Sequence, residues 1–377
     1  MNSRVEAVEI SGIRKFYNKV LKVEGAISLT LGQPDFDMPK GVKDGVVEAL
    51  KENKTTYTQN AGIVELREEI SKYLKKLNIN YNKEEICITV GGSEGIFISL
   101  MALLDEDAGV MIASPAYPAY ESIVNIVGGK VVNYELNEDF TINIENIKKK
   151  YNKDNCKYLV LSFPTNPTGA ILDKNGRDEL VEFIKKEDII VITDEIYASI
   201  IYNEYYSVAQ DESIKDKIIY ISGFSKMFSA TGLRIGYIAC TNKLMEQIMK
   251  VHQYDVSCAT SIAQYGMLSG LKNSMSDVDI MRDEFYSRKI YVVDRLKKMG
   301  IDVIDPKGAF YVFPSIKKFN MSSEEFCEKL LSSEKVACVP GSAFGKMGEG
   351  YIRISYCYSK EQLELALNKI EKFIKEI

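Results

Sequence analysis

Five short apolar runs in the middle of the chain alternate with segments of helical periodicity, and this alternation constrains the fold most strongly. The runs cover residues 86–90, 109–113, 158–162, 189–193 and 217–222. In several of them apolar residues occupy consecutive positions, as strands buried on both faces of a sheet require. Between them, a segment such as residues 176–186 has the spacing of an amphipathic helix. The sequence therefore predicts a large doubly wound α/β domain with a mostly parallel sheet over residues 45–280.

The C-terminal part of the chain has a different pattern. Residues 308–313 and 351–355 are predicted to be strands, and apolar side chains recur at helical spacing after Ser359, a plausible helix N-cap. We expect a smaller α+β domain over residues 281–377, which the N-terminal segment, residues 1–44, joins in space.

Composition and charge argue against several classes of function. The chain of 377 residues is 46% apolar and 27% charged, and its net charge of −5 comes from interleaved acidic and basic residues. It has no basic stripe for a nucleic acid, and no apolar run approaches the roughly 20 residues that span a bilayer. Charged residues throughout the first 24 positions argue against a signal peptide. We expect neither a nucleic acid nor a membrane as partner.

The cysteines and the single histidine argue against two further classes. The seven cysteines are spread along the chain without a CxxC pair, and His252 is the only histidine, so we expect no metal site. Reduced, buried thiols in a cytoplasmic protein are the simplest interpretation of these cysteines. A serine hydrolase is not expected, because there is no GxSxG elbow and His252 is interpreted as structural.

One lysine stands out because of its surroundings. Lys226 lies in the run Ser-Gly-Phe-Ser-Lys-Met-Phe-Ser-Ala-Thr-Gly-Leu-Arg-Ile-Gly, with Arg234 eight positions further on. A lysine amine can form an imine with a carbonyl cofactor, and a guanidinium suits a phosphate. An isolated lysine is most often a solvated surface residue, so the hypothesis depends on Asp194 and Asn166 upstream. Together the four residues predict a site for pyridoxal 5'-phosphate.

Asp194 and Asn166 both follow predicted strands. Ligands of α/β sheets bind beyond the carboxyl ends of strands, and Asp194 comes directly after the run 189–193. Its carboxylate could hold a pyridine nitrogen protonated, although the N-cap of a following helix is an alternative role. Tyr197 would lie near Asp194 if a helical turn follows. Asn166 lies in Phe-Pro-Thr-Asn-Pro-Thr-Gly, a turn by composition that could present its amide to a cofactor oxygen.

Three further features are less specific. Gly92, Ser93 and Glu94 open a helical segment after a predicted strand, where backbone N–H groups form an anion site. Tyr117 offers a ring face for stacking, although a position in the core or in a turn explains it equally well. Arg353 is flanked by isoleucines in a predicted strand, and its rigid fork suits a substrate carboxylate.

In this order and at this spacing, the motifs resemble those of class I/II aminotransferases of the pyridoxal phosphate fold type I superfamily. The resemblance runs from residues 31–36 to Arg353. It implies that Lys226 forms a Schiff base with the cofactor and moves the proton at the substrate Cα, and that Asp194 pairs with the ring nitrogen. It implies the following roles for the other residues: Asn166 and Tyr197 for the phenolate oxygen, Tyr117 for the ring face, Gly92, Ser93, Glu94 and Arg234 for the phosphate, and Gly32, Asn166 and Arg353 for the substrate.

The resemblance also bears on assembly and on substrate. Tyr57, in Thr-Tyr-Thr-Gln-Asn-Ala-Gly, resembles a tyrosine that reaches the phosphate of the neighbouring subunit, which implies a homodimer with shared active sites. Many relatives have a phosphate-binding serine where this chain has Gly223, so Ser225 could take that role. The second basic residue that binds the distal carboxylate in aspartate-specific relatives is not recognisable. Residues 10–14 and 250–254 look most like a bacterial branch of N-acetyl-LL-diaminopimelate and aromatic aminotransferases.

The leading hypothesis is a transaminase that moves an amino group from an L-amino acid to a 2-oxo acid in ping-pong fashion through the Lys226 Schiff base. The alternative is a C–S β-lyase on the same fold, which would use the same residues. A non-catalytic, cofactor-sensing regulator is disfavoured because the first motif starts near residue 29. A nicotinamide dehydrogenase is disfavoured because a GxGxxG motif is absent.

Overall fold

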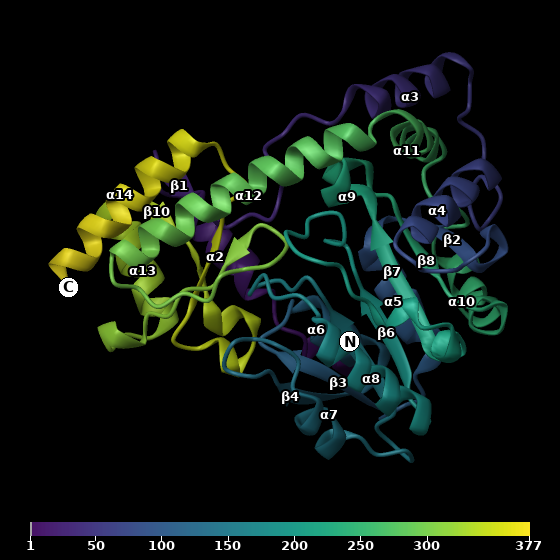
Figure 1. Cartoon of the computed structure of the whole chain (residues 1–377), viewed down its shortest axis with the longest axis horizontal. Coiled ribbons are helices and arrows are strands. Elements are labelled where there is room, and N and C mark those ends of the chain that lie inside the picture. Colours follow the sequence, from purple (N-terminus) through teal and green to yellow (C-terminus); the bar gives the residue numbers. More distant parts are fainter. Residues whose placement is uncertain (1) are drawn as a thin grey trace.

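The computed structural model describes residues 2–377 and has two lobes, which the long helix α12 (Met275–Lys298) joins along one side (Figure 1). The larger lobe holds strands β2 to β8, and the smaller lobe holds the C-terminal helices α13 (Ser323–Glu334) and α14 (Lys360–Glu376). Helix α12 runs through residue 280 without a break. The domain boundaries at residues 44 and 280 stay predictions.

Within the described residues, seven strands form the sheet of the larger lobe, in the order β2-β8-β7-β6-β5-β3-β4. Neighbouring strands are parallel except at β8, which is antiparallel to both β2 and β7. The strands are β2 (Ile86–Thr89), β3 (Gly109–Ser114), β4 (Lys130–Glu135), β5 (Tyr158–Ser162), β6 (Ile190–Asp194), β7 (Ile218–Gly223) and β8 (Gly236–Ala239). The five apolar runs are all strands of this sheet, so the predicted mostly parallel α/β fold is confirmed.

The strands are apolar at consecutive positions because both faces of the sheet are covered. In β7, Ile219 and Ile221 belong to one buried cluster, whereas Ile218 and Tyr220 belong to another. Helices α5 (Gly91–Leu103), α6 (Ala119–Val127) and α10 (Asn242–Asp255) contribute to the first cluster. Helices on the second include α4 (Val64–Lys76), α7 (Ile144–Lys150), α8 (Lys174–Lys186) and α11 (Ser261–Asn273).

The smaller lobe combines both ends of the chain. Strand β12 (Ile352–Ser355) lies between β11 (Val339–Pro340) and β9 (Tyr311–Val312) and is antiparallel to both. Near the N-terminus, β1 (Ile27–Ser28) pairs in parallel with β10 (Val336–Ala337). Ser359 begins α14 as predicted, since its Oγ accepts a hydrogen bond from the backbone N–H of Gln362 at 3.3 Å.

The remaining helices complete the fold. The α-helices are α1 (Ser3–Glu6), α2 (Gly12–Val20), α3 (Lys40–Lys51) and α9 (Phe224–Met227). The 3-10 helices are η1 (Lys83–Glu85), η2 (Val208–Gln210), η3 (Glu212–Lys217), η4 (Thr231–Leu233), η5 (Lys317–Phe319), η6 (Gly341–Phe344) and η7 (Lys346–Gly348).

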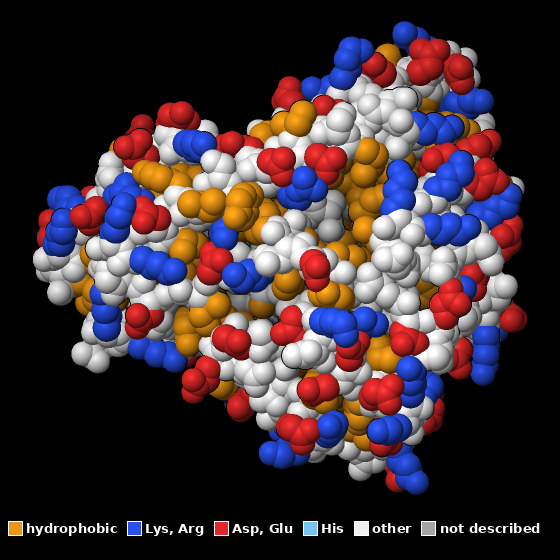
Figure 2. Space-filling view, in the orientation of Figure 1, with side chains coloured by type: hydrophobic (Ala, Val, Ile, Leu, Met, Phe, Trp, Pro, Cys, Tyr) orange, Lys and Arg blue, Asp and Glu red, His pale blue; other side chains and the backbone are white. Residues whose placement is uncertain are grey.

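The surface carries charges of both signs. On the face seen in Figure 2, Lys and Arg side chains alternate with Asp and Glu side chains, and apolar side chains gather mainly where the two lobes meet. Among the helices of residues 2–377, none has the length and the apolar character needed to cross a membrane. The seven cysteines are all free thiols, and six of them are buried.

Candidate active site

A cavity of about 250 Å³ lies at the carboxyl ends of β5 and β6, with residues of both lobes in its walls. Ser162 and Asp194, the last residues of these parallel strands, are register partners and both face the cavity. Most of the predicted site residues line it: Gly32, Gly92, Ser93, Tyr117, Asn166, Asp194, Tyr197, Ser225, Lys226 and Arg353. Residues far apart in the sequence therefore meet at one point, as the strand order predicts.

Lys226 lies on the short helix α9, directly after β7. Its Nζ donates a hydrogen bond to the carbonyl oxygen of Gly32 at 2.6 Å. Burial lowers the pKa of the Lys226 amine to about 8, and the positive charges of Arg234 and Arg353 act in the same direction. A lysine with this pKa has a substantial neutral fraction near pH 8, as a nucleophile or a general base requires.

Asp194 ends β6 and is buried beneath the cavity. Its Oδ2 accepts a hydrogen bond from the hydroxyl of Tyr120 at 2.8 Å, and its Oδ1 accepts one from the backbone N–H of Ile196 at 3.1 Å. Burial raises the pKa of this carboxyl group, and the two hydrogen bonds oppose the rise. A turn rather than a helix follows Asp194, and this turn brings Tyr197 to the cavity. A cation above Asp194 would satisfy the buried carboxylate.

Arg353 enters the cavity from β12 in the smaller lobe and is only 2% exposed. Its Nη1 donates a hydrogen bond to Oδ1 of Asn166 at 2.7 Å, and its Nη2 donates one to the carbonyl oxygen of Thr30. The guanidinium lies over the ring of Tyr311 at 4.5 Å and over that of Phe344 at 5.0 Å. Among residues 2–377, its buried Nε has no hydrogen-bond partner. A guanidinium whose Nε–H group is still unpaired is suited to a carboxylate ligand.

Two tyrosines that the sequence analysis did not identify also line the cavity. Tyr120 donates to Asp194, and the hydroxyl of Tyr311 is 2.8 Å from that of Tyr197. The spacing of Tyr117 and Tyr120 was a usable signal, because residues three apart at a helix start lie close together. Their ring centroids are 5.6 Å apart. Tyr311 offered no such signal, since it lies in a run of apolar and aromatic residues.

Three predicted residues do not line this cavity. The carboxylate of Glu94 faces the other way, with Oε1 2.7 Å from Nδ1 of His252. Arg234 lies against Gly91 at the start of α5, where a Cβ on that glycine would be 2.6 Å from the Arg234 Nη2. Tyr57 is 87% exposed on the surface of the larger lobe. The roles of these three residues stay predictions.

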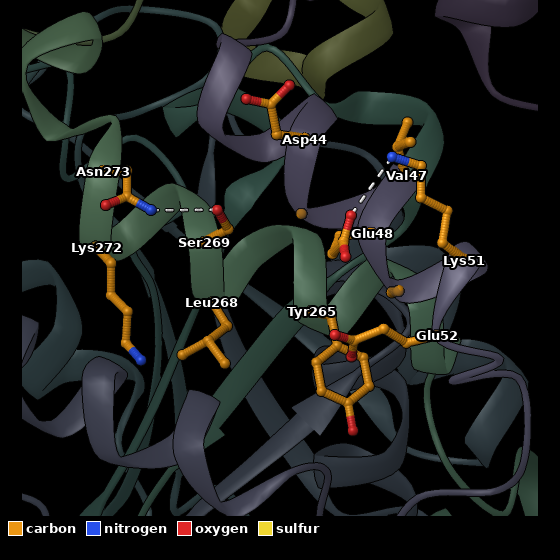
Figure 3. Close-up of a pocket in the computed structure, with 12 residues that line it drawn as sticks. Asp44, Val47, Glu48, Lys51, Glu52, Tyr265, Leu268, Ser269, Lys272 and Asn273 are labelled. Atoms are coloured by element: carbon orange, nitrogen blue, oxygen red, sulfur yellow. Dashed lines mark hydrogen bonds and ion pairs between the residues drawn. The ribbon is translucent and has the colours of Figure 1, made fainter.

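A larger groove, of about 580 Å³, lies between α3 and α11 and contains none of the predicted site residues (Figure 3). Some of its polar side chains pair along one helix. Asn273 donates to Ser269 at 3.3 Å, and Lys51 is 3.5 Å from Glu48. We place the active site in the smaller cavity, because that one combines a half-buried amine, a buried carboxylate and a buried guanidinium.

Fold and cavity together define an α/β protein in which an amine, a carboxylate and a guanidinium gather at the carboxyl ends of strands in a doubly wound sheet. Residues 24–370 match the family Aminotransferase class I and II. The chain belongs to this family and is a transaminase of the pyridoxal phosphate fold type I group. The cofactor of the family is pyridoxal 5'-phosphate, as the motifs around Lys226 predict.

Individual relatives agree with this assignment. The chain is 42% identical over 378 residues to a probable N-acetyl-LL-diaminopimelate aminotransferase of Bacillus subtilis. The matched region makes up 99% of this chain and 95% of that protein. It is 40% identical over 386 residues to an aspartate aminotransferase of Pyrococcus abyssi. That match covers 100% of this chain and 98% of the Pyrococcus abyssi protein. Among solved structures, the aromatic aminotransferase from Pyrococcus horikoshii has a TM-score of 0.93 and 37% identity, with 99% and 98% of the two chains covered. These names favour the transaminase over the β-lyase alternative.

Proposed function

We propose that this aminotransferase moves an amino group from an L-amino acid to a 2-oxo acid, and that the two substrates bind in turn, in ping-pong fashion. In this proposal Lys226 is the amine that binds the aldehyde of pyridoxal phosphate. The single observation that carries the proposal is the convergence of Lys226, Asp194, Asn166 and Arg353 on one cavity.

The residues around the cavity fit pyridoxal phosphate chemically. Within the part of the chain that the structure describes, the buried carboxylate of Asp194 has no cationic partner in hydrogen-bond range, and a protonated pyridine nitrogen would be such a partner. Gly92, Ser93 and Ser225 line the cavity at the starts of α5 and α9, where N–H groups and hydroxyls suit a phosphate. Arg234 would reinforce this phosphate site with its charge.

Tyrosine and asparagine side chains would orient the ring. Tyr117 offers its face for stacking, while Asn166 and Tyr197 would bond the phenolate oxygen. Support for the last assignment comes from their placement, since the Tyr197 hydroxyl is held by Tyr311 at 2.8 Å and the Asn166 amide by Arg353 at 2.7 Å. Side chains that are fixed in this way lose little further freedom when the ligand binds.

Proton transfer at the substrate Cα is the task we assign to Lys226. When bound, the cofactor withdraws electrons from the substrate Cα and so makes its proton removable. The Lys226 amine must be neutral to take that proton, and burial lowers its pKa to about 8. Arg353 would bind the substrate α-carboxylate through its unused Nε, with the Gly32 backbone beside it.

The proposal includes a homodimer with shared active sites. Tyr57 is a large aromatic side chain that is 87% exposed, and it does not line the cavity of its own subunit. A partner subunit that covers it would bury this ring and bring its hydroxyl to the partner's phosphate site. We also retain the predicted cytoplasmic location, which the seven free thiols support.

The test is the visible absorption spectrum of the cofactor-loaded protein, recorded with a panel of single amino acids and no oxo acid. A donor amino acid should remove the yellow band, and a 2-oxo acid should restore it. Lys226→Ala should not develop the wild-type band, whereas Lys250→Ala, on the surface of α10, should behave as the wild type does. A band that persists while pyruvate accumulates would overturn the proposal in favour of elimination.

A further inference from the structure

The single histidine of the chain is fully buried between two hydrogen-bond acceptors. His252 lies on α10 and has 0% of its surface exposed. Its Nδ1 is 2.7 Å from Oε1 of Glu94, and its Nε2 is 2.9 Å from the backbone carbonyl oxygen of Asn60. A carbonyl oxygen has no hydrogen to donate, so Nε2 must carry the hydrogen of that bond.

A second proton lies between Nδ1 and Glu94, and the surroundings place it on the histidine. The backbone N–H of Val90 donates to Oε2, the other carboxylate oxygen of Glu94. Glu94 also lies in the first turn of α5, where the helix dipole favours a negative charge. Both features stabilise the carboxylate and therefore the imidazolium. Burial lowers the pKa of His252, but contacts with Cys87 and Glu94 raise it more, to about 10.

The imidazolium connects two segments that matter for cofactor binding. Glu94 directly follows Ser93, which lines the cavity in the turn at the start of α5. Asn60 belongs to the loop that carries Tyr57 three residues earlier. These segments come from different parts of the chain, and His252 is bonded to both. Without the second proton, the Glu94 oxygen would lose its donor inside the protein, whereas the Asn60 carbonyl would keep the hydrogen of Nε2.

We propose that His252 is a positioning residue for the cofactor, a buried imidazolium that holds the phosphate turn and the Tyr57 loop in one arrangement. This inference rests on the proposed function, which assigns the phosphate to that turn. His252 does not itself line the cavity. It acts through Glu94 on the turn of its own subunit and through Asn60 on the loop that faces the partner.

The charge can be measured without any substitution, because His252 is the only histidine. In protein labelled with ¹⁵N-histidine, two-bond ¹H–¹⁵N correlation spectra distinguish a ring with two protonated nitrogens from a neutral ring. We expect both nitrogens to be protonated at pH 8 in the cofactor-free and in the loaded protein. A neutral ring at pH 8 would overturn the inference.

The effect on the cofactor is measured by titrating cofactor-free variants with pyridoxal phosphate. His252→Gln should weaken binding by about tenfold or more, as expected for the loss of a charge-assisted buried hydrogen bond. The double variant Glu94→Gln/His252→Gln should recover part of the loss, because the two amides can bond each other. Lys250→Gln removes a charge from the exposed side of the same helix and should leave binding unchanged.

A purely structural role for His252 predicts a different result. In that case His252→Gln would lower the denaturant midpoint of the cofactor-free protein but leave the pyridoxal phosphate dissociation constant unchanged, and the inference would be wrong. If His252→Gln does not fold, Glu94→Gln takes its place. That isosteric change should weaken cofactor binding and let His252 lose its charge below pH 8; unchanged binding would contradict the inference.

Failure of this inference can be distinguished from failure of the proposed function. If wild-type protein does not take up pyridoxal phosphate at Lys226, the proposed function fails, and the NMR measurement still reports the charge of His252. If the wild type takes up the cofactor and His252→Gln binds it equally well, only the role of His252 is wrong.

Discussion

At the level of single residues, burial gives Lys226 its chemistry. The pKa of its amine falls from 10.5 to about 8, so between these two pH values the amine is largely neutral where an exposed lysine would be charged. Acetylation of Lys226 in the cofactor-free protein should therefore rise about tenfold per pH unit below pH 8 and level off above it. Mass spectrometry of the Lys226 peptide measures this rate.

Two variants test the cause of this pKa shift. Asp194 raises the pKa of Lys226 and Arg353 lowers it. Asp194→Asn should therefore move the midpoint of the acetylation profile to lower pH, and Arg353→Gln should move it to higher pH. A wild-type rate that still climbs steeply at pH 10 would show that Lys226 is solvated.

Gly32 is a residue whose small size is required by its neighbours. A Cβ at this position would lie 1.8 Å from Oη of Tyr311, the tyrosine that holds Tyr197. Gly32→Ala should destabilise the fold by about 1–3 kcal/mol through overpacking. It should also lower activity by up to about a hundredfold, as expected when a positioned group moves by about 1 Å. Denaturant unfolding and steady-state kinetics measure the two effects.

The matched control for this prediction is Gly232→Ala, because nothing lies within 4 Å of a Cβ at Gly232. Adding Tyr311→Phe to Gly32→Ala removes the closest clashing atom, so the double variant should be more stable than Gly32→Ala alone. If Gly32→Ala is as stable as the control, the close contact does not exist in solution.

At the level of secondary-structure elements, the C-terminal helix α14 depends on its cap. The Oγ of Ser359 accepts the backbone N–H of Gln362 at 3.3 Å, and Leu363, Leu367 and Ile370 are buried behind it. Ser359→Ala should reduce the free energy of unfolding by about 1 kcal/mol, whereas Ser359→Asp should retain the cap. The denaturant midpoints of the two variants check this, and equal midpoints would contradict the prediction. We expect no change in pyridoxal phosphate affinity, because α14 does not line the cavity.

At the level of the whole molecule, the proposed dimer makes each active site depend on two chains. We expect light scattering to give about twice the chain mass of 42.5 kDa. Tyr57→Phe and Lys226→Ala should each lower activity when prepared alone. Mixed dimers of the two variants contain one site with an intact Lys226 and an intact Tyr57 from the partner, so activity should return on mixing. If no activity returns although subunits exchange, the sites are not shared.

Local patterns in the sequence were sufficient for much of the fold. All five predicted runs are strands to within one residue, because strands covered on both faces need apolar side chains at consecutive positions. Strands β4 and β8 were not among them. Strand β4 lies at the sheet edge, and only Tyr134 is buried there. The Ser359 cap was also predictable, because a cap involves residues only three apart.

The sequence by itself determined which chemical groups are available and, through the order of strands, that Lys226, Asp194 and Asn166 meet at one edge of the sheet. Only the tertiary structure decided how these groups are tuned. The Tyr120 hydroxyl on Asp194 comes from 74 positions away, and the Glu94 carboxylate on His252 from 158 positions away. Such contacts leave no periodic signal in a single sequence, because neither partner constrains the residues next to the other. Burial then sets the pKa values, since the removal of water depends on everything packed around a group and not on its neighbours in the chain.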